Sequence, residues 1–431
     1  MSIQSPRDFA WSSLLPLLVF CVFCECGGVA RADINVGSAL RAVTPDPLLP
    51  ISGGVGPSAP IRGKKGDLFA RAMVFEKGET RVAIVGLDFL GFPAGLSDQV
   101  REKVPGIPPQ NILIGATHNH SGPDMYGFPD GQGGRGGDPK YTAWVIEKTA
   151  EAINEAVAKL KPAALRIHVG EAKGKIAYNY YAPQLYDPRC GVIQAIRKGD
   201  AGIIATLVNY ASHPEVLGPG SRTLSPDFCG PLYDRIEKVT GGMALFMNGA
   251  QGGMVTADCR GPDGEDVQTW EECFRIGELL ANEALRIVDD APLQNDPTLY
   301  VASRKLTFPV TSPLMQQLIK LLDIGAQQGD DSRTVTTQLN LLNIGTAQLL
   351  TIPGEALPNI GYYMKRNMPG KHDFLLGLTN DAFGYILARV DFNSFKRYSY
   401  VSRTSLGEMT GEIYMEQALK LVKESPGPDK P

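Results

Sequence analysis

Apolar and polar positions alternate in blocks that predict strands and helices following one another along most of the chain. Short apolar runs predict strands at 72–75, 81–90, 112–114, 165–169, 192–196, 203–210, 244–247, 298–310, 335–352 (two strands) and 374–378. Apolar residues at helical spacing predict helices at 96–104, 141–161, 269–288, 313–324 and 412–424. Because the two kinds of element alternate without a fixed repeat or a clear linker, we predict an α/β fold. A mixed β-sheet core would be flanked by helices in one large domain over 33–431.

Residues 1–32 have the pattern of a secretory signal peptide. Arg7 precedes an apolar run over 11–23, and the segment ends in an A-R-A cleavage pattern at 30–32. We therefore expect cleavage near Asp33 and a secreted or periplasmic protein. The alternative is an uncleaved membrane anchor.

The composition is that of a soluble globular protein. Of 431 residues, 43% are hydrophobic and 20% are charged, with a net charge of −4. This mild acidity gives no reason to expect nucleic acid or an anionic membrane surface as a partner.

Four cysteines lie beyond the predicted signal peptide. In an oxidising compartment Cys190, Cys229, Cys259 and Cys273 could form two disulfides in three pairings. We weakly favour a bond between the last two, because they bracket a loop rich in Gly, Pro and Asp. Their spacings match no zinc-binding cysteine motif.

Two histidines stand close together after the strand predicted at 112–114. In extended backbone, residues two apart point the same way at roughly 6–7 Å. His118 and His120 could therefore be two metal ligands, or one ligand and one acid/base group. The chain holds only five histidines, which argues against a chance pairing.

Other predicted strands also end in polar loops with chemically useful residues. His213 follows the strand at 203–210, an N-G-A-Q-G-G turn follows 244–247, and Glu355 follows a P-G turn. Active sites of α/β proteins gather at such strand ends, and histidines with a carboxylate make a zinc site that leaves a position for water. His168, inside a predicted strand, and His372, in a predicted surface turn, are left out of this site.

A glycine-rich segment at 126–139 follows the histidine pair. An irregular segment of this length predicts a lid or substrate loop, and the alternative is a disordered insertion.

Six motifs in order resemble those of the neutral/alkaline non-lysosomal ceramidase family. They are ATHNHSGPD, NYASHPEVLG, LSPDFCG, FMNGAQGG, IPGEALPNIG and LTNDAFGYI. The resemblance runs from about residue 34 to the last predicted helix. A chain of this extent is similar to a short bacterial form of the family, which has the catalytic domain only. Each motif is short, but six in the same order are specific.

The resemblance implies a zinc-dependent N-acylsphingosine amidohydrolase. Its Zn²⁺ ligands would be His118, His213, Glu355 and Tyr385. His120 would be a catalytic residue that handles protons, and Tyr398, with Tyr400 as its rival, would bind the amide oxygen. The implied reaction is attack of a zinc-activated water on the amide of a ceramide-like lipid, which releases a fatty acid and a sphingoid base.

The chain departs from the family pattern at two places. The family's Asn-Arg motif corresponds to Asn179-Tyr180-Tyr181, and its Gly-Asp pair corresponds to Gly252-Gly253. Two alternatives therefore stay open: a catalytically silent lipid-binding protein, and a zinc hydrolase of another amide or ester. The expected partner is a lipid-like amide, with peripheral membrane contact allowed and no nucleic acid.

Overall fold

The computed structural model describes residues 33–322 and 333–430. The predicted signal peptide therefore lies outside the described residues. Contacts group Asp33–Pro431 into one compact unit. None of the helices within the described ranges combines the length and the apolar character needed to span a bilayer.

The largest element is a mixed sheet of nine strands. Eight of them follow one another in the order β13 (Met243–Asn248), β11 (Ile203–Tyr210), β10 (Arg189–Arg197), β8 (Lys161–Glu171), β1 (Asn35–Ala42), β4 (Phe69–Lys77), β5 (Thr80–Leu87) and β6 (Ile112–Ala116). The short β15 (Leu293–Gln294) pairs with β8. Neighbours are antiparallel except β5 with β6 and β11 with β13. Side-chain hydrogen bonds of Asn248 to the carbonyl oxygens of Thr117 and Ser212 connect the ends of β13, β6 and β11.

A second sheet packs against the first. It contains β16 (Leu299–Pro309), β17 (Thr334–Ile344), β18 (Ala347–Thr351) and β20 (His372–Leu376), in that order. Fully buried side chains of both sheets, such as Leu207 and Ile84 from the first and Leu342 and Phe374 from the second, form one core between them. Burial on this scale is the main stabilising term of the fold.

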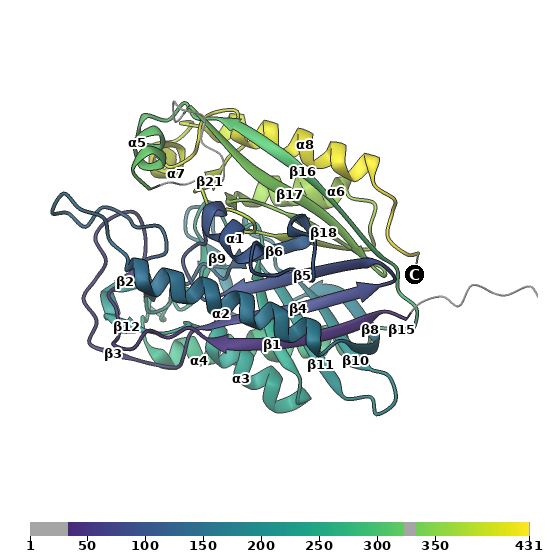
Figure 1. Ribbon diagram of the computed structural model, residues 1–431. Coiled ribbons are helices and arrows are strands. Elements are labelled where there is room, and N and C mark those ends of the chain that lie inside the picture. The colour runs from purple at the N-terminus through teal and green to yellow at the C-terminus, as the bar shows by residue number, and fades with distance from the viewer. Residues whose placement is uncertain (1–32, 323–332, 431) are drawn as a thin grey trace, which may run out of the picture. The chain divides into compact units, whose positions relative to one another are not determined.

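Helices cover the outer faces of both sheets (Figure 1). The outer face of the nine-stranded sheet packs against α1 (Ala94–Arg101) and α2 (Pro139–Ala158), and further along against α3 (Cys229–Thr240) and α4 (Trp270–Asp289). The second sheet packs against α5 (Pro313–Leu322), α6 (Pro358–Asn367) and α8 (Thr410–Glu424). The result is a helix–sheet–sheet–helix sandwich.

The predicted α/β class and mixed sheet are confirmed, and the predicted strand at 203–210 coincides with β11. Helices α3 and α6 were not predicted, because each is short and interrupted by glycine or proline near its start. The predicted surface turn at His372 is wrong: this side chain is buried at the start of β20, where its Nε2 lies 3.3 Å from Nδ1 of His168.

The expectation of disulfides is also wrong for the described chain. All four of its cysteines are buried free thiols. Cys273 is the fourth residue of α4 and hydrogen-bonds the carboxylate of Asp227. Burial raises the pKa of Cys259 to about 12, so this neighbouring thiol stays protonated at neutral pH.

Candidate metal centre and active site

The first histidine loop leaves β6 in a strained turn. His118 has φ +68°, in the left-handed region that residues other than glycine rarely adopt. The turn is held on both sides: the Asn119 side chain donates to the carbonyl oxygen of Asp88 at 3.2 Å, and the His120 N–H donates to that of Pro214 at 3.0 Å. The turn therefore aims both imidazoles toward the second histidine segment.

Three histidines meet at this point. The ring centroids of His118 and His213 are 4.6 Å apart, and those of His118 and His120 are 4.8 Å apart. One ring nitrogen from each of the three lies within 4.8 Å of the others. Three buried imidazole nitrogens at this spacing can hold a metal ion.

Backbone carbonyls fix which nitrogen of two rings faces the centre. His118 Nδ1 lies 2.6 Å from the carbonyl oxygen of Leu90, and His213 Nδ1 lies 2.8 Å from that of Val255. A carbonyl can only accept, so both Nδ1 atoms donate and both Nε2 atoms face the centre. Histidines that bind metals are oriented by such contacts.

A carboxylate completes the group. Glu355 lies on β19 (Glu355–Ala356), and its Oε2 is 3.4 Å from His118 Nε2 and 3.3 Å from His213 Nε2. This buried oxygen has no hydrogen-bond partner. Burial disfavours its charge, but His118 and His213 hold the pKa of Glu355 well below its usual range. The carboxylate is therefore ionised and faces Nε2 of both rings. Burial alone would lower the pKa of His213, but Glu215 and Glu355 raise it to about 9.

These spacings fit a zinc ion. Ligand atoms that bind one tetrahedral zinc at about 2.0–2.1 Å lie about 3.3 Å from one another. The distances of Glu355 Oε2 to His118 Nε2 and His213 Nε2 match this value. The donor set of two imidazoles and a carboxylate suits the same metal.

Tyr385 lies beside this carboxylate. It begins β21 (Tyr385–Ile386), which pairs in parallel with β19 so that Tyr385 stands opposite Glu355. Its hydroxyl is 3.7 Å from Sδ of Met254. Burial and the nearby carboxylate of Glu355 raise the pKa of Tyr385, so its hydroxyl keeps its proton at neutral pH.

His120 differs from the other two histidines. Its Nδ1 faces Oε2 of Glu215 at 3.4 Å, and its buried Nε2 has no hydrogen-bond partner. Burial lowers the pKa of His120 to about 3, so the ring is neutral and can accept a proton. Burial also opposes the charge of Glu215, but His120 and His213 lower the pKa of this carboxyl group.

Sequence reasoning missed Glu215 and also Asn248. Asn248 is the last residue of β13, and its side chain donates to the carbonyl oxygens of Thr117 and Ser212, both at 2.8 Å. It thereby ties the two histidine segments together. The N-G-A-Q-G-G turn marked this strand end, but nothing in it indicated a bridging role.

A cavity of about 80 Å³ reaches His118, His120, Glu355 and Tyr385. Its walls are mostly apolar or aromatic, and they include Leu90, Tyr126, Phe128, Met315, Leu318, Phe383 and Tyr400. The volume matches only a few water molecules at about 30 Å³ each.

The structure places the two rival tyrosines differently. Tyr400 lines the cavity, with its ring centroid 5.9 Å from that of Tyr385. Tyr398 is outside the cavity lining and packs against Tyr181 and Phe395, each with 5.5 Å between centroids. The structure therefore brings Tyr400, and not Tyr398, beside the candidate ligands.

The glycine-rich segment forms part of the cavity wall. The Asp124 carboxylate accepts backbone N–H groups of Tyr126, Gly127 and Phe128 at 2.7–3.0 Å. The rings of Tyr126 and Phe128 stack at 4.6 Å and line the cavity. The first residues of this segment are therefore folded and form part of the cavity wall, as expected for a substrate loop.

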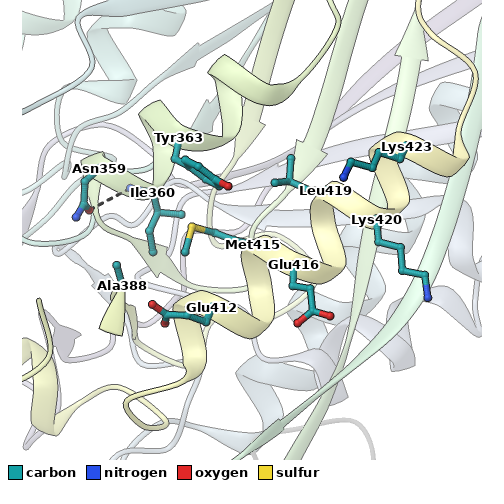
Figure 2. Close-up of a pocket in the computed structure, with 10 residues that line it drawn as sticks. All are labelled: Asn359, Ile360, Tyr363, Ala388, Glu412, Met415, Glu416, Leu419, Lys420 and Lys423. Atoms are coloured by element: carbon teal, nitrogen blue, oxygen red, sulfur yellow. Dashed lines mark hydrogen bonds between the residues drawn. The ribbon is translucent and has the colours of Figure 1, made fainter. Parts of the chain in front are cut away.

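A larger hollow lies elsewhere on the molecule. It is an open groove of about 660 Å³ between α6 and α8. Figure 2 shows the mixed charged and apolar side chains that line it. None of the candidate ligands lines it, whereas His118, Glu355 and Tyr385 line the smaller cavity.

Comparisons with known proteins bear on the fold. No protein-family model and no curated protein sequence matches the chain. A solved structure of neutral ceramidase from Pseudomonas aeruginosa matches with a TM-score of 0.71 at 18% identity, over 93% of this chain and 76% of that one. The chain has the fold of a neutral ceramidase. A structure described as ceramidase complexed with C2 matches equally, with a TM-score of 0.71 at 17% identity, over 92% of this chain and 76% of that one.

The ceramidase fold places the candidate ligands at strand ends. His118 follows β6 and His213 follows β11, both strands of the nine-stranded sheet, whereas Glu355 follows β18 of the second sheet. The candidate centre is therefore built where the two sheets meet.

Proposed function

We propose that this protein is a zinc-dependent amidohydrolase that cleaves the N-acyl amide bond of ceramide-like lipids. The observation that carries the proposal is the spacing of Glu355 Oε2 from Nε2 of His118 and of His213, which suits one zinc ion. The neutral ceramidase fold and the six ordered motifs support the substrate class. Membership of the ceramidase family and export through the N-terminal segment are part of the same proposal.

His118, His213 and Glu355, with Tyr385 beside them, would hold the zinc ion. The ion would supply Lewis acidity and lower the pKa of the attacking water. The protonated hydroxyl of Tyr385 can donate a hydrogen bond toward the amide oxygen, and Tyr400 on the cavity wall is placed for the same role.

His120 is the residue proposed to move protons. Its neutral ring has an unpartnered Nε2 at the cavity, which can take a proton from water and return it to the departing amine nitrogen. Glu215 at Nδ1 would fix the tautomer and stabilise the imidazolium that forms transiently. The products would be a fatty acid and a long-chain amine.

The test combines metal content with hydrolysis. Purified wild-type protein is expected to contain about one zinc per chain and to hydrolyse a fluorogenic ceramide. His118→Ala and Glu355→Ala should lose zinc and turnover, whereas His168→Ala, which alters a histidine outside the centre, should keep both.

Three outcomes separate the alternatives. Zinc that persists undiminished in both ligand variants contradicts the site. Zinc without hydrolysis of any amide or ester, together with ceramide binding, indicates the silent lipid-binding protein. Preference for short acyl amides or esters over ceramide indicates a hydrolase of another substrate.

A further inference from the structure

The most exposed large apolar side chains of the described residues gather in one region. Val390, Tyr180 and Phe395 are 77%, 62% and 61% exposed, more than any other large apolar side chain there. We call these three residues the aromatic rim. Isolated exposed apolar residues are normal on a protein surface, but their concentration marks a contact surface.

Ring contacts connect the rim. Tyr180 contacts Tyr181 at 5.8 Å between centroids, Tyr181 contacts Tyr398 at 5.5 Å, and Tyr398 contacts Phe395 at 5.5 Å. Val390 belongs to the same turn, because the Ser394 hydroxyl donates to its carbonyl oxygen. Residues far apart in sequence therefore share one surface.

The rim continues to the mouth of the cavity. Tyr398 directly precedes α7 (Ser399–Arg403), whose Tyr400 is 40% exposed and lines the cavity. Val55, on a different loop, also lines the cavity and is 44% exposed. In Figure 1, α5, α7 and β21, which all contribute cavity residues, lie together at one end of the molecule.

Basic residues are interleaved with the rim. Residues 389–403 hold four basic residues, Arg389, Lys396, Arg397 and Arg403, and one acidic residue, Asp391. The Asp391 carboxylate accepts a hydrogen bond from the Asn359 side chain. Arg389 is paired with Glu408 at 3.0 Å, so Lys396, Arg397 and Arg403 carry the local excess of positive charge, in contrast to the net charge of −4 of the whole chain.

We propose that the aromatic rim and its basic residues dock on a phospholipid surface with anionic headgroups. Exposed aromatic and aliphatic side chains enter the headgroup region, while lysine and arginine pair with lipid phosphates. This orientation turns the cavity mouth toward the lipid. The inference rests on the proposed function in one respect: a lipid substrate would enter through the cavity mouth.

The test measures vesicle binding without turnover. Wild-type protein should cosediment with vesicles of phosphatidylcholine and phosphatidylglycerol, and more weakly with phosphatidylcholine alone. Replacing both rim residues in Val390→Ser/Phe395→Ser should lower partitioning at least about tenfold, because one buried aromatic side chain is worth about that factor. Lys396→Glu should lower it about fivefold or more on anionic vesicles.

Matched controls lie on α3 and α4. Val239 and Phe274 are 52% and 45% exposed, so Val239→Ser/Phe274→Ser should partition like wild type. Lys238→Glu on α3 is the charge control. The rim variants should also keep wild-type hydrolysis of a soluble short-chain amide, while losing hydrolysis of ceramide in vesicles.

The proposal is overturned if wild-type protein does not bind either vesicle, or if the rim variants bind as well as their controls. It is also overturned if the rim mediates a dimer that the rim variants abolish, because a second copy then covers this surface. Vesicle binding by a protein that hydrolyses nothing would contradict the proposed function and leave the docking surface standing.

Discussion

Asp381 offers a direct test of the electrostatics beside the cavity. This side chain is fully buried in the L-T-N-D-A-F-G-Y-I motif. Its Oδ1 accepts the N–H groups of Ala94 at 3.2 Å and Ala382 at 2.9 Å, and Oδ2 has no hydrogen-bond partner. Burial raises the pKa of Asp381 from 3.8 to about 7. The folded protein therefore holds this proton more tightly than the unfolded chain does.

The sign of the effect follows from linkage. The stabilisation from the raised pKa is complete below the unfolded value of 3.8 and is lost as pH rises through about 7. The loss is about 1.4 kcal/mol per pH unit, or about 4 kcal/mol in total. Asp381→Asn mimics the protonated acid, since the amide oxygen keeps the two acceptor contacts while the charge disappears.

We therefore expect Asp381→Asn to be more stable than wild type at about pH 8, by up to about 4 kcal/mol. The gain should shrink toward zero as pH falls to about 4. Urea unfolding of both proteins in the same metal-free buffer, repeated across this range, measures the difference. Equal pH dependence of the two proteins would refute the reasoning.

Three further predictions concern the centre itself. Gly252→Ala should weaken zinc binding at least about tenfold, measured by chelator competition, because its Cβ would lie 2.2 Å from the carbonyl oxygen of Glu355. Tyr400→Phe should lower kcat about tenfold or more while Tyr398→Phe leaves it unchanged, and the reverse result in steady-state kinetics would restore Tyr398 as the substrate ligand. Glu215→Gln should lower kcat about 10–100-fold at unchanged zinc content, and equal kcat would remove Glu215 from the proposed mechanism.

Most strands, and the position of the candidate site at strand ends, could be predicted from the sequence. Fully buried strands are continuous apolar runs, and the polar residues that follow them must lie at a sheet end. His118, His213 and Glu355 each follow such a run, and the structure brings all three together. Periodicity does not say how strands pair, so the division into two facing sheets could not be read from the pattern.

The roles that could not be predicted from the sequence depend on contacts between segments that are distant along the chain. Glu215 gains its proposed role only because the loop after β6 brings His120 to within 3.4 Å of it. Spacing along the chain could not show which of Tyr398 and Tyr400 faces the cavity. Tyr400 lies in the short helix α7 and lines the cavity, whereas Tyr398 precedes that helix. His372 looked like a surface residue because its neighbours Lys371 and Asp373 are charged, yet the buried strand β20 begins with it.

The separation of the candidate ligands has a consequence for the order of events in the cell. His118 and Glu355 are separated by more than half of the chain, and they reach each other across two sheets. A nascent chain would present His118 and His213 long before Glu355 is synthesised, so tight binding of the proposed zinc ion would require both sheets to have closed. Metal uptake would then be a late maturation step that selectively stabilises completed molecules over truncated or misfolded ones.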